Sequence, residues 1–204
     1  VALDGKRGVV YAWLGEAFDR QGDFFEAVCF AKERKIPVVF VVEDNRIAIS
    51  TSTVETNPIA LGVLNQDEWR RVDGSDIEAV AIAGQKAIEH ARFGQGPAFI
   101  WCDVERFSNH SSADDQRMYR AAEELDSMHE RDPIAVFQSN MIADGLITEV
   151  DATSLEEELR EEIRAAYQQA GATQDPLAEE HTLHLTGDYS TPDSMPELDL
   201  GDSC

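Results

Sequence analysis

The stretch VVYAWLGEAFDRQGDFFEAVCFAKERKIPVVFVVEDN, residues 9–45, contains two apolar runs separated by a segment with helical periodicity. The first run, Val9–Leu14, lies between two glycines and predicts a short buried strand. The second run, PVVFVVED (37–44), has the unbroken apolar character of a parallel strand that is covered on both faces. A helix is predicted between them, from Asp23 to about Lys35. Its expected apolar face comprises Phe24, Ala27, Val28 and Ala31.

The same alternation of strand and helix continues along the chain. WRRVDGSD (69–76) predicts a short strand and a following turn. A helix is expected over 77–93, with Ser75 or Asp76 as its N-cap. AFIWCDVERF (98–107) supplies the next strong strand. We therefore predict an α/β fold with an open, mostly parallel sheet and helices on both faces.

The C-terminal part is predicted to be helical and then irregular. After a polar loop over 108–119, helices are expected over 120–130, 132–144 and 155–169. Thr153 and Ser154 are the cap candidates for the last of these helices. The composition then shifts to Thr, Asp, Pro and Ser. We predict one α/β domain over 1–171 and a flexible acidic tail or linker over 172–204.

The charge balance excludes some classes of partner. The 204 residues include 40 Asp and Glu but 17 Lys and Arg, for a formal net charge of −23. Nucleic acids and anionic membranes attract basic surfaces, so neither is expected as a partner. The acid excess suits either a salt-rich cytoplasm or an ordinary acidic enzyme subunit. The lysines are Lys6, Lys32, Lys35 and Lys86.

The cysteine pattern and the hydropathy indicate a reducing compartment. Three widely spaced cysteines form no disulfide or metal-binding framework. No apolar run approaches the roughly 20 residues of a membrane span. We therefore predict a cytoplasmic location.

Oxygen-bearing side chains follow two of the predicted strands. Glu16 comes directly after the first strand, and Asn45 follows the second. Ligands on open α/β sheets bind at the carboxyl ends of the strands. A carboxylate and an amide oxygen suit Mg²⁺ or Ca²⁺ rather than Zn²⁺. The small residues Gly15 and Ala17 would allow main-chain N–H groups to approach a phosphate. These features predict a diphosphate site completed by a divalent cation.

The same residues resemble a known signature. Residues 15–50, GEAFDRQGDFFEAVCFAKERKIPVVFVVEDNRIAIS, are similar to the thiamine-diphosphate signature of the alpha subunits of 2-oxo acid dehydrogenases. Other segments that resemble the family are VDGSD (72–76), GPAFIWCDVERFSNHSSADDQRMYR (96–120) and RDPI (131–134). The resemblance runs from Gly8 to about Ala143. The chain departs from the signature at its second glycine, which is Ala17 here.

The resemblance implies roles for eight positions. The metal ligands it implies are Glu16, Asn45 and the carbonyl oxygen of Ile47. The cofactor contacts it implies are the N–H groups of Ala17 and Phe18 and the side chain of Ile49. The catalytic residues it implies are His110 and Arg106, near the reactive ring of the cofactor. The next residue, Ser111, matches a serine that kinases modify in mitochondrial members.

The implied function is the decarboxylating component of a 2-oxo acid dehydrogenase complex. It would use thiamine diphosphate and magnesium, and it would pass the acyl group to a lipoyl arm. The implied partners are a beta subunit or a fused beta domain, a lipoyl-bearing acyltransferase component and a 2-oxo acid substrate. HSSADD (110–115) resembles the branched-chain type most. The alternatives are a pyruvate or acetoin dehydrogenase alpha subunit, or a degenerate scaffold that binds no cofactor.

Other reactive residues are expected to be structural. His90 and His129 lie in or beside predicted helices, and Cys29 is expected in the core. His181 and His184 have no further ligand nearby, so no metal site is assigned to them. Since the family's alpha subunits begin with a longer N-terminal portion, we expect this chain to be a fragment without activity of its own.

Overall fold

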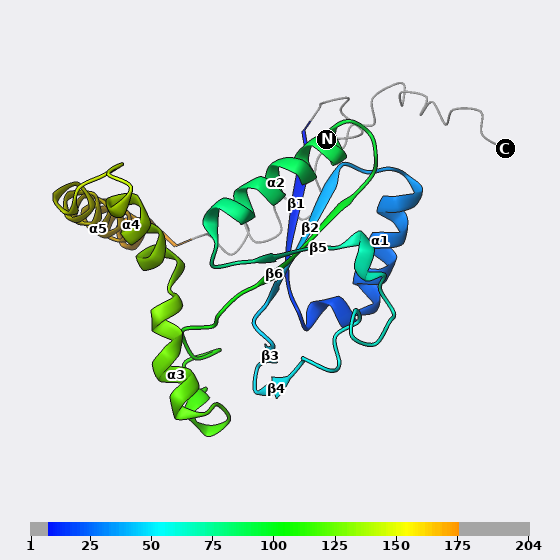
Figure 1. The fold of residues 1–204 in the computed structure, drawn as a ribbon, viewed down its shortest axis with the longest axis horizontal. Coiled ribbons are helices and arrows are strands. Elements are labelled where there is room, and N and C mark those ends of the chain that lie inside the picture. Colours follow the sequence, from blue (N-terminus) through cyan, green and yellow to red (C-terminus); the bar gives the residue numbers. More distant parts are fainter. Residues whose placement is uncertain (1–7, 176–204) are drawn as a thin grey trace. The chain divides into compact units, whose positions relative to one another are not determined.

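Four parallel strands form the central sheet of the protein (Figure 1). The computed structural model describes residues 8–175. The strands lie in the order β1-β2-β6-β5, and each adjacent pair is parallel. Their bounds are Val10–Gly15 for β1, Val38–Asp44 for β2, Ala98–Asp103 for β6 and Arg70–Asp73 for β5. The predicted open, parallel α/β sheet is therefore confirmed.

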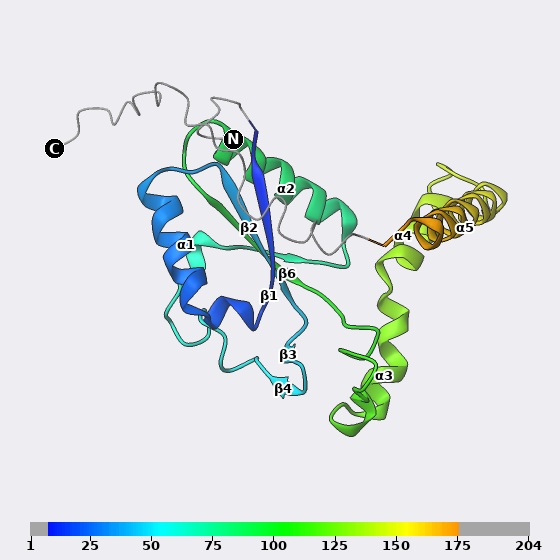
Figure 2. The same cartoon turned by 180° about the vertical axis from the view of Figure 1, so that it is seen from behind.

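Two helices cover opposite faces of this sheet, as Figures 1 and 2 show. Helix α1 spans Gly22–Glu33, and helix α2 spans Ile77–Arg92. Side chains alternate between the two faces of a strand, so β2 contributes to both cores. Phe40 packs in the α1-side core, whereas Val39 and Val41 pack in the α2-side core. Both faces of β2 are therefore covered. This accounts for the unbroken apolar sequence from which the strand was predicted.

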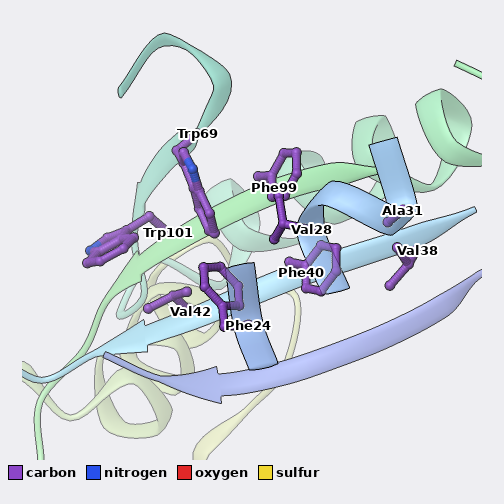
Figure 3. Packing of buried hydrophobic residues seen from close by; sticks show 9 residues of the cluster. All are labelled: Phe24, Val28, Ala31, Val38, Phe40, Val42, Trp69, Phe99 and Trp101. Carbon is purple, nitrogen blue, oxygen red and sulfur yellow. The ribbon is translucent and has the colours of Figure 1, made fainter. Parts of the chain in front are cut away.

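Aromatic rings fill the core between α1 and the sheet (Figure 3). Phe99 of β6 stacks on Phe40 of β2, with ring centroids 5.5 Å apart. Trp69 lies 4.9 Å from Phe99 and 5.6 Å from Trp101, again between centroids. Phe24 of α1 meets Phe40 edge-on at 5.9 Å. Such pairs stabilise beyond their buried area by about 0.5–1.5 kcal/mol each. This aromatic core fixes the strands whose ends carry the candidate site.

The first strand differs from its prediction because it is not buried. Val10 and Trp13 of β1 are 48% and 59% exposed. Among the described residues, β1 pairs only with β2, so one of its edges has no neighbouring strand. An apolar run predicts a strand but does not reveal how many neighbours that strand has.

The apolar face of α1 is also narrower than predicted. Phe24, Val28 and Ala31 are buried, whereas Ala27 is exposed. Cys29 is exposed as well, so its predicted place in the core is wrong. The buried residues follow the spacing i, i+4, i+7, because α1 contacts the sheet along a single stripe.

A small hairpin follows β2 and was not predicted. Strands β3 (Ile47–Ala48) and β4 (Thr51–Ser52) pair antiparallel. Strands of two residues are too short to show the alternation that identifies a strand in a sequence. The sequence therefore gives no signal for this hairpin.

The remaining elements are short turns and helices. They are η1 (Phe18–Arg20), η2 (Gln66–Glu68), η3 (Gln116–Met118), α3 (Ala122–Met128), η4 (His129–Arg131), α4 (Pro133–Ala143) and α5 (Glu149–Ala172). Helix α5 begins six residues before its prediction. Thr148 and Asp151 form a capping box at its start, so Thr153 and Ser154 lie inside the helix.

Within residues 8–175, the chain divides into two compact units, with the division between Asn140 and Met141. The predicted boundary between 171 and 172 stays a prediction. Most of the predicted tail lies outside the described residues, as do His181 and His184. Within residues 8–175, no helix combines the length and the hydrophobicity that a membrane span requires.

Gly74 follows β5 at a position where any larger residue should destabilise the fold. A Cβ atom there would lie 2.5 Å from Val104 Cγ1 and 2.8 Å from the carbonyl oxygen of Asp103. Gly74→Ala must therefore push two strand ends apart, and we expect a loss of about 1–3 kcal/mol in unfolding free energy. Gly22→Ala is the matched control, because a Cβ at Gly22 meets no atom within 4 Å. Denaturant unfolding measures both variants, and equal midpoints would contradict this account.

Candidate functional site

The carboxyl ends of three strands meet at one edge of the sheet. Gly15 at the end of β1 lies opposite Glu43 of β2, and Asp44 of β2 lies opposite Asp103 of β6. Glu16 follows directly after β1, and the segment 104–120 leaves the sheet from the end of β6. The sheet register therefore brings the predicted site segments together.

Glu16 is buried against the turn that follows β2. The residue is 3% exposed, and its carboxylate lies near the main-chain N–H groups of Glu16 itself, Asn45 and Ile47. Burial raises the pKa of Glu16 above its ordinary value, and the nearby Asp44 carboxylate raises it further. The hydrogen bonds from the main chain partly oppose this shift. The site therefore holds a desolvated acid beside a second acid.

That second acid, Asp44, organises the turn itself. Asp44 is 4% exposed and accepts hydrogen bonds from Trp101 Nε1 (3.0 Å) and from the N–H group of Arg46 (2.8 Å). Asn45 Oδ1 accepts from the N–H group of Ile47 at 3.2 Å. Arg46 has a φ of 67°, in the left-handed region. Two side chains thus hold the turn that carries two of the predicted metal ligands.

The residues after Glu16 adopt an ordinary backbone conformation. Ala17 has φ −81° and ψ −25°, which any residue adopts without strain. The alanine therefore replaces the glycine of the signature without a conformational cost. Ala17 and Phe18 begin the turn η1, where N–H groups have no partner within the turn. Both residues are exposed.

Ile49 lies in the connection between β3 and β4 and is strained. Its φ is 61°, which is a true outlier for a β-branched residue. In two-residue hairpin turns this position favours glycine. The side chain of Ile49 is 57% exposed, and its carbonyl oxygen accepts a hydrogen bond from Arg106 Nη1 at 2.9 Å. A contact from a distant loop thus holds the strained turn.

Arg106 belongs to a network that orders the loop carrying His110. Its Nη2 donates to the hydroxyl oxygen of Tyr119, which in turn donates to Asp114 Oδ2 at 2.6 Å. The same carboxylate accepts from the N–H group of His110 at 2.8 Å. Hydrogen bonds from Tyr119 and His110 lower the pKa of Asp114. His110 itself is exposed, so its imidazole is available for chemistry.

Glu105 joins this loop to the turn after β2. Its carboxylate contacts Arg46 Nη2 at 2.8 Å, Arg131 Nη2 at 2.6 Å and Arg120 Nη2 at 3.5 Å. The side chain of Glu105 is 12% exposed, and that of Arg120 is 3% exposed. Arg120 also donates to the carbonyl oxygen of Arg106 at 2.9 Å. Three arginines from separate segments therefore meet at one carboxylate beside the candidate site.

Sequence reasoning missed the residues that hold the site in place. Asp44, Trp101, Glu105 and Tyr119 received no role of their own. Asp44 and Trp101 are 57 residues apart, and Arg46 and Glu105 are 59 residues apart. The only signal in the sequence was for Glu105, which directly precedes Arg106 after a strong strand.

The donor atoms fit a hard divalent cation. Glu16 offers a carboxylate, Asn45 an amide oxygen and Ile47 a carbonyl oxygen, which are the types that Mg²⁺ takes. A cation would offset the charge of the buried Glu16 and of the neighbouring Asp44. Within residues 8–175, no three side chains of His, Cys, Asp or Glu gather in a metal-binding cluster. The implied magnesium set therefore rests on mixed oxygen donors.

Comparisons with known proteins identify related sequences. Residues 1–179 match the family described as "Dehydrogenase E1 component". The "Pyruvate dehydrogenase E1 component subunit alpha" of Bacillus subtilis is 34% identical over 177 residues, which cover 82% of this chain and 47% of the relative. The protein of that name from Staphylococcus epidermidis is 33% identical, with 83% and 47% covered.

A eukaryotic relative gives the same picture. The "Pyruvate dehydrogenase E1 component subunit alpha type I, mitochondrial" of Ascaris suum is 33% identical over 189 residues. That match covers 90% of this chain and 46% of the relative. The chain spans about half the length of the curated relatives it matches.

Glu16→Gln should stabilise the metal-free chain. The folded-state pKa of Glu16 lies above its ordinary value of 4.5, so its charged form destabilises the fold above that folded-state pKa. The penalty disappears as the pH falls below 4.5, where the acid is protonated in both states. We expect a gain of about 0.5–2 kcal/mol at neutral pH, which is typical of stabilising substitutions at functional sites.

Thermal unfolding in a chelator, at neutral pH and near pH 4, measures this effect. Glu43→Gln is the matched control, because Glu43 is the last residue but one of the neighbouring strand and is exposed. We expect Glu43→Gln to stay within about 0.5 kcal/mol of the parent. If Glu16→Gln were less stable than the parent at neutral pH, the buried charge of Glu16 would not destabilise the fold.

Glu105→Gln should destabilise the site. It removes the counter-charge that three guanidinium groups share, although the nearly buried Arg120 keeps its other partner, Glu124, at 2.6 Å. We expect a loss of about 2–3 kcal/mol, less than for a fully buried pair because Arg46 and Arg131 are half exposed. Glu156→Gln, which removes an exposed pair with Arg160, should cost less than about 0.5 kcal/mol. Similar losses in both variants, measured by denaturant unfolding, would argue against a central role for Glu105.

Proposed function

Because the chain belongs to the dehydrogenase E1 component family, we propose that it is the cofactor-binding part of an alpha-type subunit that decarboxylates a 2-oxo acid. It would use thiamine diphosphate and magnesium. The observation that carries this proposal is the burial of Glu16 against the Asn45–Ile47 turn at the carboxyl ends of the strands. A buried acid with a raised pKa, beside a second acid, is typical of a functional site.

In this proposal each predicted residue has a binding task. Glu16, Asn45 and the carbonyl oxygen of Ile47 hold the magnesium ion. The N–H groups of Ala17 and Phe18 donate to the diphosphate of the cofactor. Ile49 supports the proposal by its exposed side chain, which would lie against the pyrimidine ring.

The loop residues would act on the substrate and its acyl group. Thiamine diphosphate, when bound, accepts the electrons released on decarboxylation. His110 is exposed and carries an imidazole, which can hold or supply a proton during acyl transfer to lipoyl. Arg106 is occupied by Ile49 and Tyr119, which supports a role in ordering the loop rather than in free anion binding.

Pyruvate is the first 2-oxo acid to test as the substrate. The sequence HSSADD suggested a branched-chain 2-oxo acid, but the reported relatives are named for pyruvate. The branched-chain interpretation is therefore not supported, and the comparisons favour the pyruvate alternative. We extend the name of these relatives to this chain only as part of the proposal.

Partners and location complete the proposal. A beta subunit or fused beta domain would complete the active site, and a lipoyl-bearing acyltransferase component would receive the acyl group. The cytoplasmic location and the lack of activity in the isolated chain also stay predictions. The degenerate-scaffold alternative rested on Ala17 and Phe18, and the ordinary conformation of Ala17 removes part of its basis.

Calorimetric titration with thiamine diphosphate, with and without Mg²⁺, tests the proposal on the full-length protein and its beta partner. We expect magnesium-dependent binding that weakens by roughly 100-fold in Glu16→Gln, because a direct metal ligand is lost. Glu43→Gln should bind like the parent, since Glu43 is exposed beside the same edge. Pyruvate decarboxylation should fall in parallel with binding.

Two results would overturn the proposal. Absence of magnesium-dependent binding in the parent would favour the scaffold. Equal binding by the parent and Glu16→Gln would remove Glu16 from the metal site. Faster decarboxylation of a branched-chain 2-oxo acid than of pyruvate would restore the branched-chain interpretation while leaving the metal site intact.

A further inference from the structure

Three of the four lysines of this acidic chain line one groove. The groove has a volume of about 440 Å³ and lies at the amino ends of the strands. We call it the amino-edge groove. Its lining residues are Lys32, Lys35, Glu68, Arg70, Ala83, Lys86, Ala87, His90, Gln95, Pro97, Ala98, Phe99 and Ile100. The net charge of the chain is −23, so a cluster of cationic side chains in one groove is unusual for this protein.

The lining of the groove is strongly positive. Three lysines and Arg70 contribute four positive charges, and Glu68 contributes one negative charge, so the lining carries 4 − 1 = +3 with His90 neutral. Lys32 pairs with Glu68 and lies 5.4 Å from the centroid of the Phe99 ring. Lys35, Arg70 and Lys86 form no ion pair with any acid within residues 8–175. Three cations are therefore available to a ligand.

One of these cations occupies a backbone position that disfavours it. Lys35 follows the C-cap of α1 and has a φ of 48°, where helices most often place glycine. A side chain there costs about 1 kcal/mol relative to glycine. The helix end already carries Lys32 and Arg34, so its dipole does not require a further cation. Neither the backbone conformation nor the helix dipole therefore favours a lysine at this position.

The floor of the groove is apolar and concave. β5 pairs with β6 only from Ile100 onward, so Ala98 and Phe99 have no β5 residue beside them. Ala83 and Ala87 of α2 provide small buried side chains above this gap. An apolar floor with a few polar groups at the rim, at this volume, is typical of sites for small molecules.

We propose that the amino-edge groove binds a small organic phosphate with an aromatic or apolar part, such as a nucleoside diphosphate. Lys35, Lys86 and Arg70 would contact the phosphates, and the apolar floor of the groove would contact the apolar part. Lysines and arginines are the usual phosphate-binding cations of proteins. The groove lies about 20 Å from Glu16, at the opposite ends of strands of six or seven residues. The proposal is therefore independent of the cofactor site.

Titration of the full-length protein with ADP in EDTA tests this site, because a site that depends on a divalent cation cannot contribute. We expect saturable binding that weakens at least about tenfold in the double variant Lys35→Gln/Lys86→Gln, since two charge-assisted contacts are lost. The double variant Arg92→Gln/Arg160→Gln changes the net charge equally outside the groove and should bind like the parent.

A third variant should act in the opposite direction. Glu68→Gln releases Lys32 from its ion pair, so it should tighten ADP binding severalfold. A merely structural role for the lysines does not produce this gain. The proposal is overturned if the parent shows no saturable ADP binding, or if both double variants weaken binding equally. Binding of an acidic peptide such as polyglutamate without binding of ADP would also overturn it, in favour of a protein partner.

Discussion

The buried hydrogen bond between Trp101 and Asp44 connects the core of the protein to its candidate site. Trp101 is 1% exposed and packs against Trp69 in the aromatic core, while its indole N–H group donates to Asp44 at the end of β2. An indole N–H group that lost this acceptor would remain buried without a partner, at a cost of about 1–3 kcal/mol. The position of Asp44 is thus set by the packing of large side chains. The turn Asn45–Ile47 begins from that fixed point.

The electrostatics of the site follow from the same arrangement. Asp44 raises the pKa of Glu16, which burial has already raised. No ion pair between an arginine and Glu16 forms within residues 8–175, although Arg46 and Arg106 lie in the adjoining segments. Arg46 binds Glu105, and Arg106 binds Ile49 and Tyr119. The arginines therefore fix the loops rather than pair with Glu16.

Sequence reasoning found the elements of the sheet because their signals are local. β2 and β6 are continuous apolar runs, and α2 has a clear cap in Asp76. It failed where the answer depends on distant neighbours. The exposure of β1 depends on which strands lie beside it, and the exposure of Cys29 depends on how α1 approaches the sheet.

The candidate site shows the same division between local and distant information. Glu16 and Asn45 could be selected from the sequence, because each follows a recognisable strand and parallel strands end at the same edge. The contacts that hold these residues could not be selected. Glu105 reaches Arg46 across 59 positions, and Arg106 reaches Ile49 across 57. No periodicity or spacing rule relates such positions.

Backbone strain provides a final link between the two functional regions. The described residues other than glycine with positive φ are Lys35, Arg46 and Ile49. Strained positions of this kind persist only when surrounding contacts hold them, and they gather at functional sites. Arg46 and Ile49 are held by Glu105 and Arg106, which explains why the loop after β6 is needed for the turn after β2. Lys35 has no comparable contact from a described side chain, and it lies in the amino-edge groove. Its left-handed conformation is held by the main chain instead, because the N–H group of Ile36 donates to the carbonyl oxygen of Ala31 at 2.9 Å where α1 ends.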